Sequence, residues 1–153
     1  MKLVRTTKTK FLFDLGRREE RLFREVLKLY PRVPSAHHVL SKSGRLPHRE
    51  ADQRLLDEAL AEQRAEHKQQ VAALLADPQR LAPGETGSHL SLLHGEAEWL
   101  LQVLNDIRVG SWIILGAPEE KLPELNEANA PHYWAMEMAG HFQAQLLEAM
   151  HEA

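Results

Sequence analysis

The sequence predicts a mainly α protein, a four-helix bundle-like single domain over residues 1–153 with a short N-terminal β strand or hairpin. Three observations lead to this class. Apolar residues recur at helical spacing in four segments, and connectors dense in proline and glycine separate those segments. Phe11 and Phe13 alternate within the first residues, as is typical of a strand. A chain of 153 residues is long enough to bury one core without a disulfide or a metal.

The order of the elements follows from the same spacing. The first helix is expected to stop at Pro31, and the second to start at Pro47, where a missing N–H has no intrahelical partner. Gly116 followed by Pro118 is a common helix stop and ends the third. The predicted elements are an extended segment at 2–14, helices at 17–30, 47–76, 90–115 and 127–151, and connectors at 31–47 and 77–89.

Charge is divided unevenly along the chain. Residues 1–50 hold 13 Lys and Arg against 5 Asp and Glu, a net charge of +8. The remaining 103 residues hold 6 bases against 17 acids, a net charge of −11. Such asymmetry indicates either an acidic partner or two halves of one fold that face each other.

Composition also excludes several classes of protein. The chain has no cysteine, so a disulfide framework and a thiolate metal site are both ruled out. The N-terminus lacks the apolar run of a signal peptide. Residues 99–116 are the one apolar stretch near membrane-spanning length, and charges interrupt it. We therefore expect a cytoplasmic protein with no membrane partner and no cofactor.

The charges within that apolar stretch are Asp106 and Arg108. On a helix they lie about 160° apart, on opposite flanks of the inward face, so they cannot pair with each other. A half-buried charge needs a partner to offset its desolvation. We expect Asp106 to reach the basic first third of the chain and Arg108 to reach a carboxylate of an acidic helix.

The same segment carries a resemblance. Its sequence EAEWLLQVLNDIRVGSWIILG, with the run from Leu104 to Arg108, resembles an uncharacterised bacterial family of actinobacterial type, catalogued as domain of unknown function 2017. FLFDLGRREERLFREVL and YWAMEMAGHFQAQLLEAM agree with that family more loosely. The resemblance implies no catalytic residue, because the family has no established activity. Members are often encoded near the Clp protease adaptor, which implies a link to regulated proteolysis.

Nine histidines invite a metal or an enzyme hypothesis. Helical bundles that bind two metal ions use two Glu-x-x-His motifs, whereas this chain has a single one, from Glu148 to His151. His67 and His132 fall on the apolar stripes of their helices, so they are candidates for a buried polar pair or the lining of a small pocket. No phosphate loop, nucleophile elbow or zincin motif accompanies them.

Two surface features suggest binding. Trp134 and Met138 lie one turn apart on the polar side of the last helix, which is typical of an interface. The first helix carries a basic ridge, which could neutralise phosphates or face the acidic helices within the fold. The basic ridge consists of Arg17, Arg21, Arg24 and Lys28.

From these features we expect a non-enzymatic accessory or regulatory protein that acts through contacts with another protein or with a second copy of itself. One alternative is nucleic-acid binding through the basic ridge. Another is a small-molecule or metal-dependent enzyme with its site in the bundle core, around His67 and His132.

Overall fold

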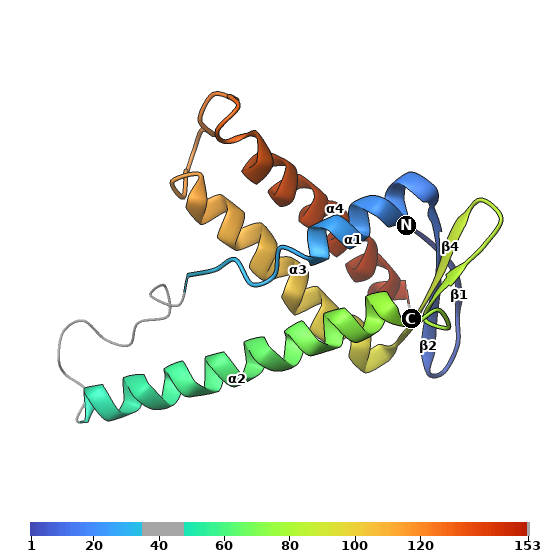
Figure 1. The fold of residues 1–153 in the computed structure, drawn as a ribbon, viewed down its shortest axis with the longest axis horizontal. Coiled ribbons are helices and arrows are strands. Elements are labelled where there is room, and N and C mark those ends of the chain that lie inside the picture. Colours follow the sequence, from blue (N-terminus) through green and yellow to red (C-terminus); the bar gives the residue numbers. More distant parts are fainter. Residues whose placement is uncertain (35–47, 153) are drawn as a thin grey trace.

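The computed structural model describes residues 1–34 and 48–152 (Figure 1). Most of the predicted connector at 31–47, and the predicted helix start at Pro47, lie outside the described residues. The described elements, in chain order, are β1 (Lys2–Thr6), β2 (Lys10–Gly16), α1 (Arg17–Leu27), α2 (Arg49–Ala76), β3 (Leu81–Pro83), β4 (Gly87–Leu93), α3 (His94–Ile114) and α4 (Ala130–Glu152).

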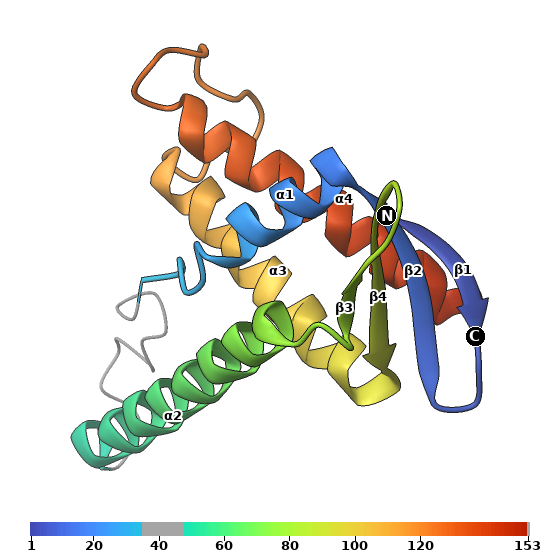
Figure 2. The same ribbon diagram turned by 45° about the vertical axis from the view of Figure 1, so that its right-hand side comes forward.

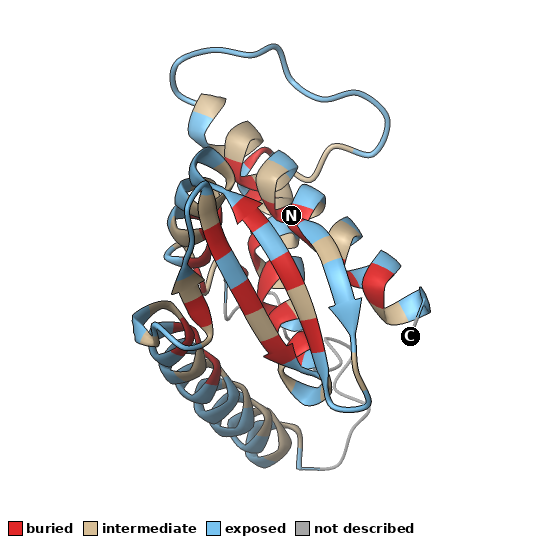
Figure 3. Cartoon of the chain, turned by 90° about the vertical axis from the view of Figure 1, so that its right-hand side faces the viewer, coloured by how far each residue is buried: buried red, intermediate tan, exposed pale blue. Residues whose placement is uncertain are grey.

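The prediction of a four-helix bundle with only a short N-terminal β element is wrong. The strands form one antiparallel sheet in the order β1-β2-β4-β3. β3 and the start of β4 occupy the predicted connector at 77–89, and residues 90–93 belong to β4 rather than to the third helix. The physical reason is that side chains along β4 alternate between buried and exposed positions with a period of two residues, as in a strand. Ser88, Leu90 and Leu92 are buried, whereas His89 and Leu93 are exposed, an alternation visible along β4 in Figure 3.

The helices cover one face of this sheet. α3 and α4 lie side by side and form the largest helix–helix contact, while α1 lies against both (Figures 1 and 2). α2 extends away from the other elements, and its buried residues, His67, Val71 and Leu74, all lie in its C-terminal half. The sheet, α1, α3 and α4 therefore share one core, which α2 joins only through its C-terminal half.

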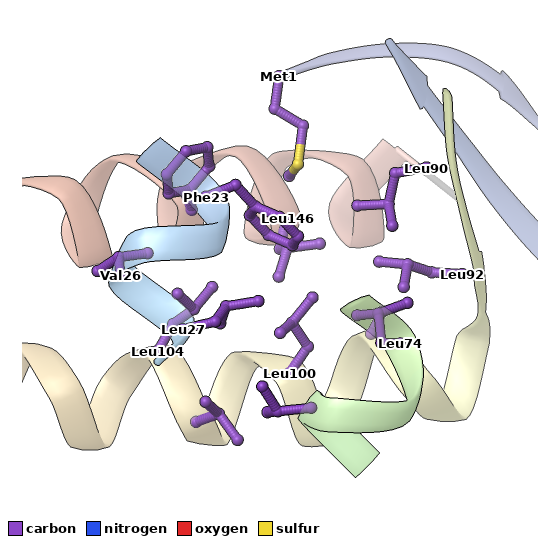
Figure 4. Close-up of a cluster of buried hydrophobic side chains, with 14 of the residues drawn as sticks. Met1, Phe23, Val26, Leu27, Leu74, Leu90, Leu92, Leu100, Leu104 and Leu146 are labelled. Atoms are coloured by element: carbon purple, nitrogen blue, oxygen red, sulfur yellow. The ribbon is translucent and has the colours of Figure 1, made fainter. Parts of the chain in front are cut away.

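One hydrophobic cluster joins all the elements (Figure 4). Each large apolar side chain that is fully buried contributes roughly 1.5–3 kcal/mol relative to exposure. The labelled side chains of Figure 4 come from the N-terminus, all four helices and β4, and α2 contributes Leu74 from its last turn. They are Met1, Phe23, Val26, Leu27, Leu74, Leu90, Leu92, Leu100, Leu104 and Leu146.

The fourth helix begins at Ala130 and not at 127, and the end of α1 and the start of α3 differ from the predicted boundaries for local reasons. α1 ends at Leu27, and the amides of Leu29 and Tyr30 donate to carbonyls three residues earlier, so the last turn tightens before Pro31. α3 begins after Leu93, whose amide donates to the carboxylate of Glu96 at 3.0 Å. Among the helices of residues 1–34 and 48–152, none is long and apolar enough to cross a membrane.

Candidate functional site

Asp106 binds the backbone of the segment that follows α1. Its Oδ1 accepts hydrogen bonds from the amide of Arg32 at 2.6 Å and from the amide of Val33 at 3.3 Å. Gly110, one turn further along α3, permits the close approach, because an added Cβ would lie 2.5 Å from the carbonyl carbon of Arg32. The partner of Asp106 thus comes from the basic first third, but it is backbone and not a basic side chain.

The side chain of Arg32 extends this contact to two further groups. Its guanidinium donates to the hydroxyl of Ser111 at 3.0 Å and lies 3.4 Å from Nδ1 of His132. Ser111 is fully buried and donates in turn to the carbonyl of Ile107. Burial lowers the pKa of Arg32 from its ordinary value. These contacts join the 30–33 segment to α3 and α4.

Arg108 does not reach a carboxylate, contrary to the prediction. Its side chain is exposed and donates to Asn105 Oδ1 at 3.1 Å on the same helix. Asn105 Oδ1 also accepts from Gln143 of α4 at 3.2 Å. No ion pair joins Arg108 to any acid of the described residues. An exposed guanidinium keeps its hydration, so no buried partner is required.

The two inward histidines do not form a pair. His67 is 8% exposed, lies 3.4 Å from the hydroxyl of Tyr30 and stacks on Trp99. His132 instead lies beside Arg32 at the start of α4. No group of three or more potential metal ligands occurs within residues 1–34 and 48–152. The hypothesis of a site shared by both histidines was therefore wrong, because α2 and the start of α4 contact different parts of the 30–33 segment.

A polar cleft of about 320 Å³ lies between α2 and α3. Its charged and aromatic groups contact the chain itself: Asp106 binds the Arg32 and Val33 amides, Arg64 donates to the carbonyl of Val33, and Tyr30 meets His67. Burial raises the pKa of Tyr30, the charge of Asp106 raises it further, and Arg64 opposes both. The cleft is thus the place where the 30–33 segment is held.

Trp134 and Met138 are half-buried and not the exposed pair that the helical spacing suggested. Both pack against the hydrophobic cluster. Met138 also borders a hollow of about 440 Å³ together with Leu22 and Phe142. Much of the Trp134 and Met138 surface is therefore used within the fold.

The basic ridge of α1 is divided between the fold and solvent. Arg17 donates to the carbonyl of Glu85 at 3.0 Å. Arg24 pairs with Glu20 at 3.1 Å and donates to the carbonyl of Leu75 at 2.8 Å, near the C-terminus of α2. Arg21 and Lys28 are exposed.

The chain from Arg24 in α1 to Tyr30 beyond it runs antiparallel to α2. Arg24 meets Leu75, and Tyr30 meets His67. Beside this seam lies a groove of about 380 Å³ with mainly apolar walls, two lysines and no acid in its lining. We call it the α1–α2 groove, and its lining residues are Leu27, Lys28, Tyr30, Lys68, Val71, Ala72, Leu75 and Ala76. Helical spacing within either helix gave no signal for it, because the groove depends on how two helices cross.

The second feature that the sequence did not reveal is the loop between α3 and α4. Leu122 and Leu125 in this loop are 43% and 71% exposed. The loop backbone is nevertheless held by side chains. Trp112 donates to the Pro118 carbonyl at 3.0 Å, Asn129 donates to the Glu124 carbonyl at 2.8 Å, and Tyr133 donates to the Pro123 carbonyl.

Reciprocal hydrogen bonds complete this bracing: the amides of Asn126 and Asn129 each donate to the side chain of the other, at 2.8 and 2.9 Å. Residues 119–127 carry four glutamates and one lysine, a net charge of −3. The acidic loop, residues 117–129, is thus an ordered segment that presents leucines and carboxylates to solvent.

Comparison with known proteins adds no further information about the site. No family model matches the chain, and neither the curated proteins nor the solved structures give a match.

Proposed function

We propose that the protein is a cytoplasmic, non-enzymatic accessory or regulatory protein, and that its α1–α2 groove binds an acidic, leucine-bearing segment of a protein partner. The observation that carries this proposal is the groove itself: apolar walls flanked by Lys28 and Lys68, with no acid among the lining residues. Neither lysine forms an ion pair with an acid of the described residues.

Each part of the groove has a role in such binding. Leu75, which is half-buried, and Ala72, which is exposed, offer apolar surface that a leucine side chain can cover, and burying that surface drives association. Lys28 and Lys68 select for carboxylates beside the leucines and against basic segments. The groove length fits a short segment, because residues 68–76 of a helix span about 12 Å.

The polar cleft between α2 and α3 favours this binding role over catalysis. Its acid, base and aromatic groups are engaged by the 30–33 segment, so they are already hydrogen-bonded within the chain. A catalytic group needs to reach a reacting atom. The α1–α2 groove, in contrast, is open to a partner.

The experiment uses a fluorescently labelled peptide with two leucines three residues apart between glutamates, measured by anisotropy. We expect saturable binding that weakens as salt rises from about 50 mM to about 500 mM, since exposed charges are screened. Lys28→Glu combined with Lys68→Glu should weaken binding about tenfold or more. The matched control is Arg5→Glu with Arg54→Glu, which changes the net charge by the same amount at exposed positions outside the groove and should leave binding unchanged. Equal binding of a lysine-substituted peptide would overturn the proposal.

A link to regulated proteolysis is a further proposal that rests on the resemblance around Leu104–Arg108. The purified Clp adaptor can be titrated into the labelled protein. We expect binding that the Lys28→Glu, Lys68→Glu variant loses. Absence of binding would overturn the link, and binding that this variant keeps would overturn the groove as its site.

Nucleic-acid binding is the second candidate function, and the outer face of the sheet favours it. Lys2, Arg5 and Lys10 on this face, and Lys8 in the β1–β2 turn, are all exposed. Several lysines on one surface can neutralise phosphates. Retention of duplex or single-stranded DNA at low salt, lost when Lys8 and Lys10 become glutamate, would support it. No retention at low salt would eliminate it.

A further inference from the structure

We infer that the occupant of the α1–α2 groove is the acidic loop of a second copy of this chain. The inference rests on the proposed function, because it names the partner of the same groove. It starts from charge: the groove offers Lys28 and Lys68, and the acidic loop offers Glu119, Glu120 and Glu124.

The apolar groups of the two surfaces also match. Leu125 is the most exposed of the large apolar side chains of the described residues, at 71%, and Leu122 is 43% exposed. Leucines in the same short loop, three residues apart, are separated by at most about 10 Å along an extended chain. The groove wall from Lys68 to Ala76 is about 12 Å long by helical rise, so it can receive both.

The bracing of the acidic loop lowers the cost of binding. Trp112, Asn129 and Tyr133 all donate to its carbonyls, so the backbone around the two leucines is ordered before any contact is made. An ordered segment loses less conformational entropy on association than a flexible one. A loop whose backbone is fixed while its leucines face water is thus preorganised for a second surface.

Self-association is tested with two complementary charge reversals of the full chain. The groove variant carries Lys28→Glu and Lys68→Glu, and the loop variant carries Glu120→Lys and Glu124→Lys. Sedimentation velocity measures association of each variant alone and of an equal mixture. We expect each variant alone to associate at least about tenfold more weakly than the unmodified chain. We expect the mixture to recover association, because the acidic loop of one variant then meets the basic groove of the other.

A net-charge control, a leucine substitution and a check of folding complete the test. Glu58→Lys with Glu62→Lys changes the net charge as the loop variant does, and it should leave association unchanged. Leu125→Ser removes an exposed leucine at little cost to the fold, and it should weaken association by about tenfold or more. Circular dichroism confirms that each variant has the helix content of the unmodified chain.

The outcomes distinguish this inference from the proposed function. An unmodified chain that stays monomeric while the labelled acidic peptide binds the groove would overturn the second copy as occupant and leave the proposed function standing. Self-association that none of the groove and loop variants changes would overturn the inference as well, since another surface would be responsible. Failure of both the peptide and the chain to bind would overturn the proposed function and the inference together.

Discussion

Asp106 Oδ1 lies 2.6 Å from the backbone nitrogen of Arg32, so a carboxylate of α3 caps the amides of a segment more than seventy residues earlier in the chain. The same oxygen accepts from the amide of Val33 at 3.3 Å. The acid within the apolar stretch of α3 therefore fixes where the chain crosses that helix. This role is structural.

Replacing Asp106 with alanine should destabilise the fold by about 1–3 kcal/mol, because two amides lose their acceptor in a half-buried position. Asp106→Asn keeps an acceptor oxygen and should cost less than Asp106→Ala. Urea unfolding followed by circular dichroism measures both differences. Equal costs for the alanine and asparagine variants would show that the hydrogen bonds contribute little.

Gly110→Ala should be one of the more damaging small substitutions in α3. Its Cβ would lie 2.5 Å from two atoms of Arg32, so backbone must shift, at a cost of roughly 1–3 kcal/mol. Gly95 is the control in the same helix, because an added Cβ there meets nothing within 4 Å. Gly95→Ala should be neutral or stabilising by up to about 1 kcal/mol. Thermal unfolding of the two variants compares them directly, and equal melting temperatures would refute the close approach.

Glu20 should make the stability of the protein fall in acid. Its hydrogen bond with Ser88 of β4, and then its contact with Arg24, hold the pKa of Glu20 below its ordinary value of 4.5 despite the opposing effect of burial. A carboxyl whose folded pKa is lowered stabilises the protein above its ordinary pKa and loses that contribution as pH falls through the folded value.

Glu20→Gln should thus be less stable than the unmodified protein near neutral pH, and the difference should shrink below about pH 4.5. Free energies of unfolding measured in urea at several pH values test this. A difference that stays constant from about pH 7 to about pH 3 would show that the carboxylate is not favoured by folding.

Asn129→Ala should release the acidic loop while the core stays folded. Its side chain accepts from the Asn126 amide and donates to the Glu124 carbonyl, and both contacts disappear in the variant. We expect the Asn126 amide to exchange with solvent faster, while amides in the centre of α3 keep their protection. Hydrogen exchange read by NMR distinguishes this local opening from global unfolding. Equal acceleration of α3 amides would mean that the loop is coupled to the core.

The sheet shows where reasoning from the sequence stopped. The expected helices occur where long apolar stripes exist, but β4 was partly assigned to a connector and partly to α3. The run SLL at 91–93 satisfies a helical spacing with the residues that follow it, so the period of α3 masks the period of β4. Residues 91–93 form a strand and not a helix because β4 pairs with β2 on one side and with β3 on the other. Pairing between segments that are distant in sequence cannot be read from a local pattern.

The candidate site was less predictable than the fold for a related reason. Because Asp106 lies in an apolar helix, the sequence predicts that its carboxylate needs a partner. The sequence does not predict that backbone amides are this partner, because every residue type except proline has one. The groove beside Val71 and the exposure of Leu125 depend on how helices cross and how a loop is braced. Only three-dimensional packing supplies these.

The order of strands in the sheet also has a consequence for folding. β2 and β4 are neighbours, yet residues 17–86 lie between them, so the central pairing of the sheet closes a long excursion of the chain. Closing a loop of this length lowers the conformational entropy of the chain before the contacts between the strands form and stabilise it. Contacts between residues that are distant in sequence therefore slow folding. Both walls of the α1–α2 groove lie within this excursion. Substitutions in β2 and β4 that weaken this pairing are therefore expected to slow folding.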